Sequence, residues 1–213
     1  MMTTKKIIDI THAITPTLPL WPESPGALVT RLLDMQEGAE ANVSQISIEA
    51  HTGTHIDAPL HFVATGKTTL EIPLNKLIGP CQVVHIQGEK SITADILENL
   101  SIPKDCKKLL LKTDNQALWA SNSSKFDKDF CALSADGAQW VVDRGIELIG
   151  IDYLSIQRFH DSIKTHQVLL QNEVVILETL KLDEVSEGNY RLYCLPLKLE
   201  GLEGVPVRAI LEF

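Results

Sequence analysis

Three histidines and one aspartate lie close together in the segment from residue 51 to residue 61. They are His51, His55, Asp57 and His61. Neutral imidazole nitrogens and carboxylate oxygens are the usual protein ligands of zinc and similar divalent ions. The segment therefore predicts a centre for divalent metal ions. Such a centre can lower the pKa of a bound water molecule until it is a nucleophile at neutral pH.

The spacing of these four residues favours an extended chain over a helix. All four numbers are odd, and alternate side chains of an extended chain point the same way. A helix would turn Asp57 away from the histidines, and Gly53 and Pro59 oppose a continuous helix. We therefore predict an extended or strand-then-turn conformation, in which Gly53 and Pro59 allow a fixed turn. The alternative is a chance cluster of polar surface or capping residues.

One short segment does not complete a hydrolytic metal site, and the second half of the chain offers further ligands. His166 lies in a predicted helix. Glu178 directly follows the apolar run Val174–Leu177, where a carboxylate is badly placed for a plain solvated strand. The alternative for Glu178 is an exposed strand end.

Nine short segments predict strands, because they are rich in Val, Ile and Leu and bounded by Gly, Pro, Asn or Asp. Several are continuous apolar runs, as in strands covered on both faces. The segments are Ile7–Ile10, Ala27–Leu33, Val43–Glu49, Gln82–Ile86, Lys108–Lys112, Glu147–Ile151, Val174–Leu177, Tyr190–Leu195 and Val207–Leu211.

Three helices are predicted between these strands, at Thr93–Leu100, Ser134–Arg144 and Ser162–Asn172. The first two begin at a residue that can cap a helix, and the second ends before Gly145, a natural helix stop. The polar segment Ala120–Asp129 predicts an exposed loop. Because no repeat or change of composition marks a boundary, we expect one mixed α/β domain over residues 1–213.

Composition excludes several classes of function. The net charge of −9 and pI near 5.2 argue against a nucleic-acid partner, which usually meets a basic surface. The chain has no apolar window of 18 residues, so no membrane span is expected, and Asp9 interrupts any signal-peptide core. Scattered cysteines suit a reducing cytoplasm and are expected as small core residues. Ser155, Cys81 and Cys194 lack the elbow or paired base of a catalytic nucleophile.

The segment His51–His61 resembles the HxGTHxDxPxH signature of the cyclase-like metal hydrolases, which include bacterial kynurenine formamidase (an arylformamidase) and isatin hydrolase. The resemblance extends over nearly the whole chain, although only the histidine motif is specific. The supporting segments are Pro19–Pro25, Asn42–Val43, Leu77–Cys81, Leu148–Asp152, Val175–Glu178, Leu195–Lys198 and Pro206–Ala209. The resemblance implies the swivelling β/β/α fold of that family.

The resemblance also implies a role for each candidate residue. The ligands of one metal would be His51, His55 and Asp57, with Asp57 also reaching a second ion. The second ion would be bound by His166 and Glu178, and Glu178 would bridge both. The twelve-residue step from His166 to Glu178 matches the family and favours His166 over His160. The proton donor and acceptor would be His61, and Trp21 would line the substrate pocket.

The reaction implied is hydrolysis of an amide bond in a small aromatic substrate by a metal-bound hydroxide, as in arylformamidases that act on N-formylkynurenine in tryptophan catabolism. Zinc is the expected cofactor and manganese the alternative, with one or two ions in each subunit of a homodimer or larger homo-oligomer. Two other functions remain open. One is an isatin-hydrolase-like opening of a cyclic amide, and the other is a catalytically silent metal-binding protein on the same fold.

The chain departs from formamidases at two places near the expected substrate. It reads Trp21-Pro-Glu-Ser24 where formamidases usually show Trp-Pro-Gly-Asp, and Tyr153–Gln157 replaces their usual Thr-Pro-Ser. These departures put the identity of the substrate in doubt and leave the metal chemistry untouched.

Overall fold

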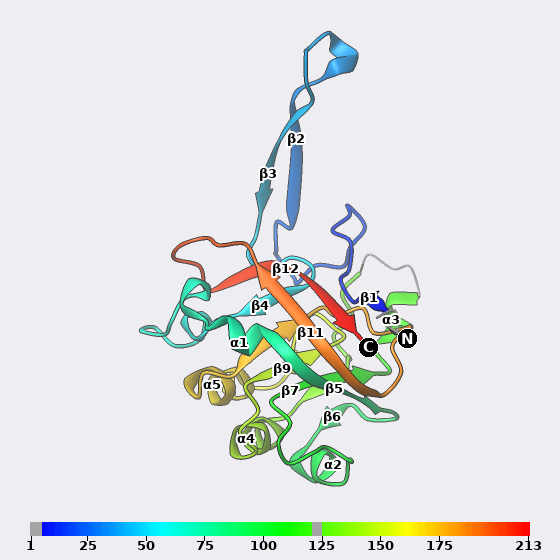
Figure 1. Cartoon of the computed structure of the whole chain (residues 1–213), viewed down its shortest axis with the longest axis vertical. Coiled ribbons are helices and arrows are strands. Elements are labelled where there is room, and N and C mark those ends of the chain that lie inside the picture. The colour runs from blue at the N-terminus through cyan, green and yellow to red at the C-terminus, as the bar shows by residue number, and fades with distance from the viewer. Residues whose placement is uncertain (1–5, 121–124) are drawn as a thin grey trace, which may run out of the picture.

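The computed structural model describes residues 6–120 and 125–213 (Figure 1). Its strands are β1 (Ile7–Asp9), β2 (Ala27–Leu33), β3 (Val43–Ile48), β4 (His55–Asp57), β5 (Ile78–Ile86), β6 (Ser91–Ile92), β7 (Lys108–Thr113), β8 (Ala132–Leu133), β9 (Leu148–Ile151), β10 (Val175–Glu178), β11 (Gly188–Pro196) and β12 (Gly204–Glu212). Its α-helices are α1 (Leu74–Leu77), α2 (Ala94–Glu98), α3 (Gln116–Ala120), α4 (Ala135–Asp143) and α5 (Lys164–Gln171). Short 3-10 helices are η1 (Met35–Glu37), η2 (Pro59–His61) and η3 (Thr69–Glu71).

Seven strands close into a barrel. The order is β12-β11-β5-β7-β9-β10-β4, and β4 closes the ring because it pairs with both β10 and β12. The pairs β5–β7, β7–β9 and β9–β10 are parallel, whereas β4, β11 and β12 pair antiparallel with their neighbours. The short β1 continues the sheet at the edge of β12. The mixed α/β prediction is confirmed.

The barrel separates two hydrophobic cores, because neighbouring residues of a strand point to opposite faces. One core fills the barrel and contains Leu110, Leu148 and Leu177. The other lies outside it, where Leu109 and Ile149 pack under the helices. Helices α2, α4 and α5 cover this outer face (Figure 1). Strands β9 and β10 are buried along their whole length, which confirms that their continuous apolar runs are covered on both faces.

The predicted strands and helices are present, with ends shifted by a few residues. The side chain of Thr93 caps α2 and that of Ser134 caps α4, as their sequences indicate. The sequence did not predict helices α1 and α3 or the two-stranded sheet β6–β8. Their segments of two to five residues are too short to show a full period of hydrophobicity. None of the described helices is long and apolar enough to cross a membrane.

Strands β2 and β3 form a sheet of their own that projects from the barrel as a long arm (Figure 1). Every residue of both strands is exposed, in contrast to β9 and β10. The predicted exposed loop Ala120–Asp129 lies partly outside the described residues, at 121–124. In its described part Phe126 is half-buried, because its ring packs against Trp21 and Phe159.

Candidate metal centre

The segment 51–61 is a turn, a short strand and a 3-10 helix in succession. His51 lies in a turn in which Gly53 has a φ of 70°, a conformation that favours glycine. His55 and Asp57 are the first and last residues of β4, and Pro59 begins η2, which ends at His61. The strand-then-turn prediction is confirmed from residue 55 onward. The extended conformation does not reach His51, because bends at residues 52–54 separate it from the strand.

Strand pairing places three of the predicted ligands on one face. In the β4–β10 ladder, His55 lies directly opposite Glu178 and Asp57 opposite Ile176. Opposed residues share a face, and so do residues two apart in a strand. Since Ile176 belongs to the core outside the barrel, His55, Asp57 and Glu178 all point outward, toward the helical layer.

Helix α5 brings His166 onto this face. The Nε2 atom of His166 lies 3.3 Å from Oε1 of Glu178 and 3.8 Å from Oδ2 of Asp57. The Nε2 atom of His55 lies 3.4 Å from Oε2 of Glu178 and 3.5 Å from Oδ1 of Asp57. On the other side, Nδ1 of His51 lies 2.9 Å from Oδ1 of Asp57. The structure therefore gathers all five predicted ligands around the carboxylate of Asp57.

Two overlapping sets of donor atoms have the spacing needed to hold a metal ion. The first set is His51, His55 and Asp57, and the second is Asp57, His166 and Glu178. Asp57 belongs to both sets and is fully buried. A carboxylate has two oxygens, so one side chain can serve two neighbouring ions.

The donor atoms suit a divalent cation. Among the buried side-chain atoms without a hydrogen-bond partner in the described chain are Nε2 of His51, Nε2 of His55 and Oδ2 of Asp57. A buried polar atom left without a partner is costly, and such atoms are usually explained by an ion or a water molecule. Imidazole and carboxylate together are the donor set that zinc commonly takes. The residues therefore fit a metal centre.

Neighbouring groups fix the orientation of these ligands. Nδ1 of His55 donates to the carbonyl oxygen of Gly53 at 2.8 Å, and Nδ1 of His166 donates to Oε1 of Gln157 at 3.1 Å. Each bond turns the remaining ring nitrogen, Nε2, toward the centre, as is usual for metal-binding histidines. The backbone N–H of Ile156 donates to Oε1 of Glu178 at 2.7 Å.

Two residues of the site were missed in the sequence. Gln157 ends the segment Tyr153–Gln157, which departs from the formamidase pattern. In the structure its side-chain oxygen accepts a hydrogen bond from His166. Gly204 leaves room for His51, because a Cβ atom at residue 204 would lie 2.5 Å from Cε1 of that ring. An isolated glutamine and glycine, distant in sequence from the motif, carry no signal that could have identified them.

The charges of the cluster are strongly coupled. Burial alone would lower the pKa of His55, but hydrogen bonds to Asp57 and Glu178 outweigh it and raise that pKa to about 10. Burial likewise opposes protonation of His51, yet the charge of Asp57 raises its pKa. Burial favours the neutral form of Asp57, but His51 holds its pKa well below the usual range. Metal binding here would therefore displace protons from histidines and meet carboxylates that are already ionised.

His61 lies beside both donor sets without belonging to either. Its ring stacks on His51 with 4.1 Å between centroids and lies 5.9 Å from the ring of His166. Burial, together with the charges of these two histidines, lowers the pKa of His61. His61 is therefore neutral at pH 7, with a nitrogen free to accept a proton.

The structure also places Trp21 and His160. Trp21 is 40% exposed and packs at 4.9 Å from the ring of Phe126 and 5.3 Å from that of Phe159. Phe159 lies two residues beyond Gln157, so this aromatic cluster is connected to the segment that contacts the ligands. His160 is exposed and belongs to neither donor set, so the geometry favours His166 over it.

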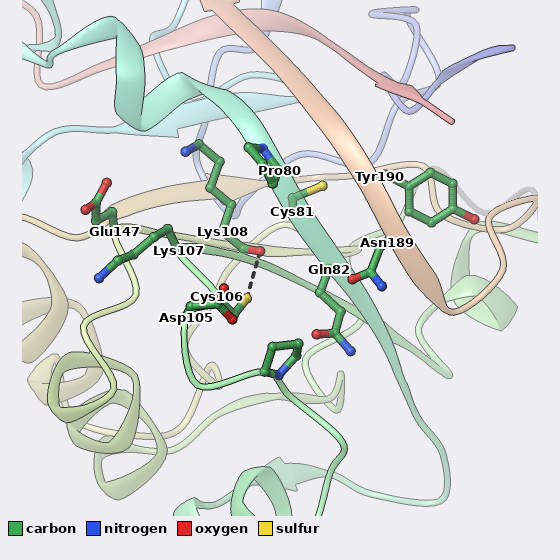
Figure 2. A pocket seen from close by; sticks show the side chains of 11 residues that line it. Pro80, Cys81, Gln82, Asp105, Cys106, Lys107, Lys108, Glu147, Asn189 and Tyr190 are labelled. Carbon is green, nitrogen blue, oxygen red and sulfur yellow. Dashed lines mark hydrogen bonds between the residues drawn. The ribbon is translucent and has the colours of Figure 1, made fainter. Parts of the chain in front are cut away.

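A cavity of about 420 Å³ lies away from the metal centre, near the amino-terminal ends of β7 and β9 (Figure 2). Glu178, in contrast, ends β10 at its carboxyl end. The cavity is lined by Cys81 and Cys106, and burial raises the pKa of Cys81 to about 12. The thiol is therefore neutral at pH 7, as expected of a core cysteine. All four cysteines are free thiols.

Comparison with known proteins agrees with the geometry. Residues 8–158 match the Cyclase family model, described as "Putative cyclase". Cyclase-like protein 1 of Arabidopsis thaliana is 41% identical over 215 residues, which cover 97% of this chain and 84% of that protein. Cyclase-like protein 2 of Oryza sativa subsp. japonica is 39% identical over 218 residues, with coverages of 97% and 79%.

Solved structures show the same fold. A "predicted metal-dependent hydrolase" from Bacillus stearothermophilus has a TM-score of 0.83 and 34% identity, and 99% of each chain is covered. A "potential metal-dependent hydrolase with cyclase activity" also has a TM-score of 0.83, with 35% identity and 98% coverage of each chain. Isatin hydrolase A from Ralstonia solanacearum shares the fold at a TM-score of 0.81 and 20% identity, covering 98% of this chain and 92% of its own. This chain therefore belongs to the cyclase family, among relatives described as metal-dependent hydrolases.

Proposed function

We propose that this protein is a metal-dependent hydrolase that cleaves the amide bond of a small aromatic substrate, in the manner of an arylformamidase. The observation that carries the proposal is the sharing of Asp57 by two donor sets, in which Nε2 of His51, Nε2 of His55 and Oδ2 of Asp57 are buried without a hydrogen-bond partner among the described residues. The set His51, His55 and Asp57 would hold one ion. The set Asp57, His166 and Glu178 would hold a second, with Glu178 also facing His55.

Zinc is the proposed ion, with manganese as the alternative, since three imidazoles and two carboxylates suit both. When bound, such ions polarise a carbonyl oxygen and lower the pKa of a water molecule. Groups of the protein itself would meet the other requirements of amide hydrolysis. The shared carboxylate of Asp57 fixes the distance between the two sets, and the backbone N–H of Ile156 holds Glu178 in place.

His61 is proposed to move the proton. A neutral imidazole can accept a proton from the attacking water and then donate it to the leaving nitrogen. The lowered pKa of His61 keeps the ring neutral before the reaction, as the first of these steps requires. The stack on His51 holds its ring beside the ligands.

The aromatic cluster Trp21, Phe126 and Phe159 is proposed as the wall that receives an aromatic ring of the substrate. Its rings are tilted to one another, and Trp21 is partly exposed, so a planar substrate has a face on which to pack. The substrate would be a small molecule, and the acidic surface argues against a nucleic acid.

A substrate screen tests this proposal. The protein is loaded with zinc or manganese and mixed with N-formylkynurenine, with simple aryl formamides and with isatin, and ultraviolet absorbance follows the reaction. We expect turnover of a formamide, and loss of that turnover in Asp57→Asn, which weakens both donor sets. Turnover of isatin alone would instead identify a cyclic amide, rather than a linear one, as the class of substrate. Metal binding without turnover of any amide would show a silent metal-binding protein.

A further inference from the structure

The cavity of Figure 2 lies at the end of the barrel opposite the metal centre. Two of its lining residues are Lys108, which begins β7, and Glu147, which directly precedes β9. Glu178 ends β10, which runs parallel to β9. The cavity volume of about 420 Å³ lies within the usual range of small-molecule sites, about 300–1,000 Å³. A molecule bound here would therefore be separate from the metal ions.

Lys108 is an almost fully buried lysine in the wall of this cavity, with only 4% of its surface exposed. Nearby in the chain, the ammonium groups of Lys107 and Lys112 donate to carbonyl oxygens, at 3.0 Å and 2.6 Å. Among the described residues, the ammonium of Lys108 has no hydrogen bond, and Glu147 acts on it only as a more distant charge. An unpaired buried charge is costly, and burial lowers the pKa of Lys108. The fold therefore places a cation at the cavity wall without supplying its anion.

The backbone of β5 leaves space for this ammonium at Gly79. Gly79 adopts a φ of 142°, a conformation that favours glycine. A Cβ atom at this position would lie 3.2 Å from Nζ of Lys108 and 3.7 Å from its Cε. A side chain at residue 79 would therefore crowd the head of Lys108, and glycine keeps the place beside the ammonium open.

The rest of the lining is mainly apolar (Figure 2). Its members include Pro80, Pro103 and Tyr190, together with the thiols of Cys81 and Cys106. Ligand sites commonly combine an apolar wall with a few polar groups that fix the orientation of the ligand. One unpaired ammonium in an apolar wall suits an apolar molecule with a negative charge.

The acidic residues of the lining limit the charge of that molecule. Asp105 and Glu147 both line the cavity, and they would repel an anion of two or more charges. The ammonium of Lys107 is already bonded to the carbonyl oxygen of Gly145. A monocarboxylate therefore fits this lining better than a phosphate does.

We propose that this cavity is a second binding site, which takes a small monocarboxylate with an apolar body. The carboxylate accepts from Nζ of Lys108, and such a charge-assisted hydrogen bond is stronger than one between neutral groups. Pro80, Pro103 and the ring of Tyr190 pack against the apolar body. The donor sets of the metal centre take no part, because none of their residues lines the cavity.

Calorimetric titration of the full chain with benzoate tests the site. Benzoate should bind with a Kd of about 1 mM or lower, a modest affinity for so small a molecule. Benzamide has nearly the same shape without the charge, and should bind at least tenfold more weakly. Lys108→Met should weaken the binding of benzoate at least tenfold. Lys107→Met removes the same charge from the neighbouring residue and should leave the affinity within about twofold of that of the wild type.

Urea unfolding shows whether Lys108→Met keeps its fold. Because the substitution replaces an unpaired buried charge with an apolar chain of similar length, the variant should be as stable as the wild type or more stable. Weaker binding of benzoate by this variant would then reflect the lost ammonium.

Cys106 reports where benzoate binds, and this readout needs no variant. It lines the cavity and is partly exposed, whereas the other three cysteines are buried. Benzoate should slow the reaction of Cys106 with a disulfide reagent at least threefold, measured by mass spectrometry of the modified peptide. Asp57→Asn, which weakens both donor sets of the metal centre, should show the same protection.

Several results would overturn the site. They are a wild type that binds no benzoate, equal binding of benzamide, unchanged affinity in Lys108→Met, and lost affinity in Lys107→Met. Binding that leaves Cys106 unprotected, or that disappears in Asp57→Asn, would place benzoate elsewhere, and the proposal would fail. None of these results depends on whether the protein hydrolyses an amide, so the proposed function stands or falls separately.

Discussion

The imidazole Nε2 of His166 lies 3.3 Å from Oε1 of Glu178, although His166 belongs to α5 and Glu178 ends β10. Asn172 and Glu173 reverse the chain between helix and strand, and Glu173 adopts a φ of 57°. The twelve-residue separation is thus the length of one helix–turn–strand unit. The position of each residue depends on the packing of α5 against the barrel.

We expect Gln157→Leu to weaken the binding of metal by the set that contains His166. The substitution removes the oxygen that accepts from Nδ1 of His166, so the ring loses the bond that aims Nε2 at the centre. Loss of such a partner typically costs about 10–100-fold in metal affinity. Competition with a chromophoric chelator measures the change.

Gln157→Glu is the matched control, because it keeps an acceptor of the same length. Its metal affinity should stay within a few-fold of that of the wild type. An unchanged affinity in Gln157→Leu would show that packing alone orients His166.

The sequence was sufficient to predict most of the strands that form the barrel, although not its closure, and the family resemblance supplied the full set of five ligand candidates. Strands such as β9 and β10 are recognisable by their continuous apolar runs, since both faces are covered. The motif at 51–61 is local, so its donor atoms need only a turn and three residues of strand to converge. From the residues alone Glu178 could also have been an exposed strand end, and only the resemblance to the cyclase-like hydrolases favoured it as a ligand candidate.

What could not be predicted depends on contacts between distant segments. The bond of Gln157 to His166 and the space that Gly204 leaves for His51 exist only once the sheet has closed. The sequence of strand β2 resembles that of an ordinary buried strand, yet all of it is exposed. A hydrophobic pattern in a strand therefore does not by itself show that the strand is buried.

His61→Ala should separate proton transfer from metal binding. Because His61 lies outside both donor sets, the variant should keep its metal and its fold. Turnover of a confirmed substrate should fall by about 10²–10⁴-fold, the usual worth of a positioned acid or base. His51→Ala is the comparison and should lose metal affinity and activity together. Release of metal by His61→Ala, or near-normal turnover, would refute the assigned role.

Because of His12, we expect the stability of the fold to decrease in mild acid. Its ring stacks on Trp119 at 4.0 Å, its Nε2 atom has no hydrogen-bond partner among the described residues, and burial lowers its pKa to about 4. In the unfolded chain the pKa is about 6.5. Between these two values the unfolded state binds the extra proton, so stability should fall as the pH falls from about 6.5 to about 4. The loss from this group is up to about 3 kcal/mol.

Urea unfolding at several pH values measures this contribution. His12→Phe keeps a ring on Trp119 and removes the titrating group, so its stability should depend less on pH in that window. The histidines of the metal centre titrate in both proteins, and the difference between the two curves isolates His12. If stability depended on pH in the same way in both proteins, groups other than His12 would be the cause of the acid sensitivity.

Gly204→Ala should disturb the metal centre without removing a ligand. Gly204 lies opposite Asp57 in the β12–β4 ladder, and a Cβ atom there would lie 2.5 Å from Cε1 of His51 and 2.9 Å from both of its ring nitrogens. Such contacts require the ring to move. The expected result is at least tenfold weaker binding by the set His51, His55 and Asp57, measured by zinc titration.

The same substitution in a His51→Ala background provides the control. With the imidazole ring absent, the added methyl group meets nothing at those positions, so the cost of Gly204→Ala in unfolding free energy should shrink. Overpacking a filled site costs typically about 1–3 kcal/mol, and a double-mutant cycle assigns the interaction to the pair. An equal cost in both backgrounds would place the effect in the β12 backbone. Unchanged zinc binding in the single variant would show that His51 tolerates displacement, and its assignment as a ligand would then fail.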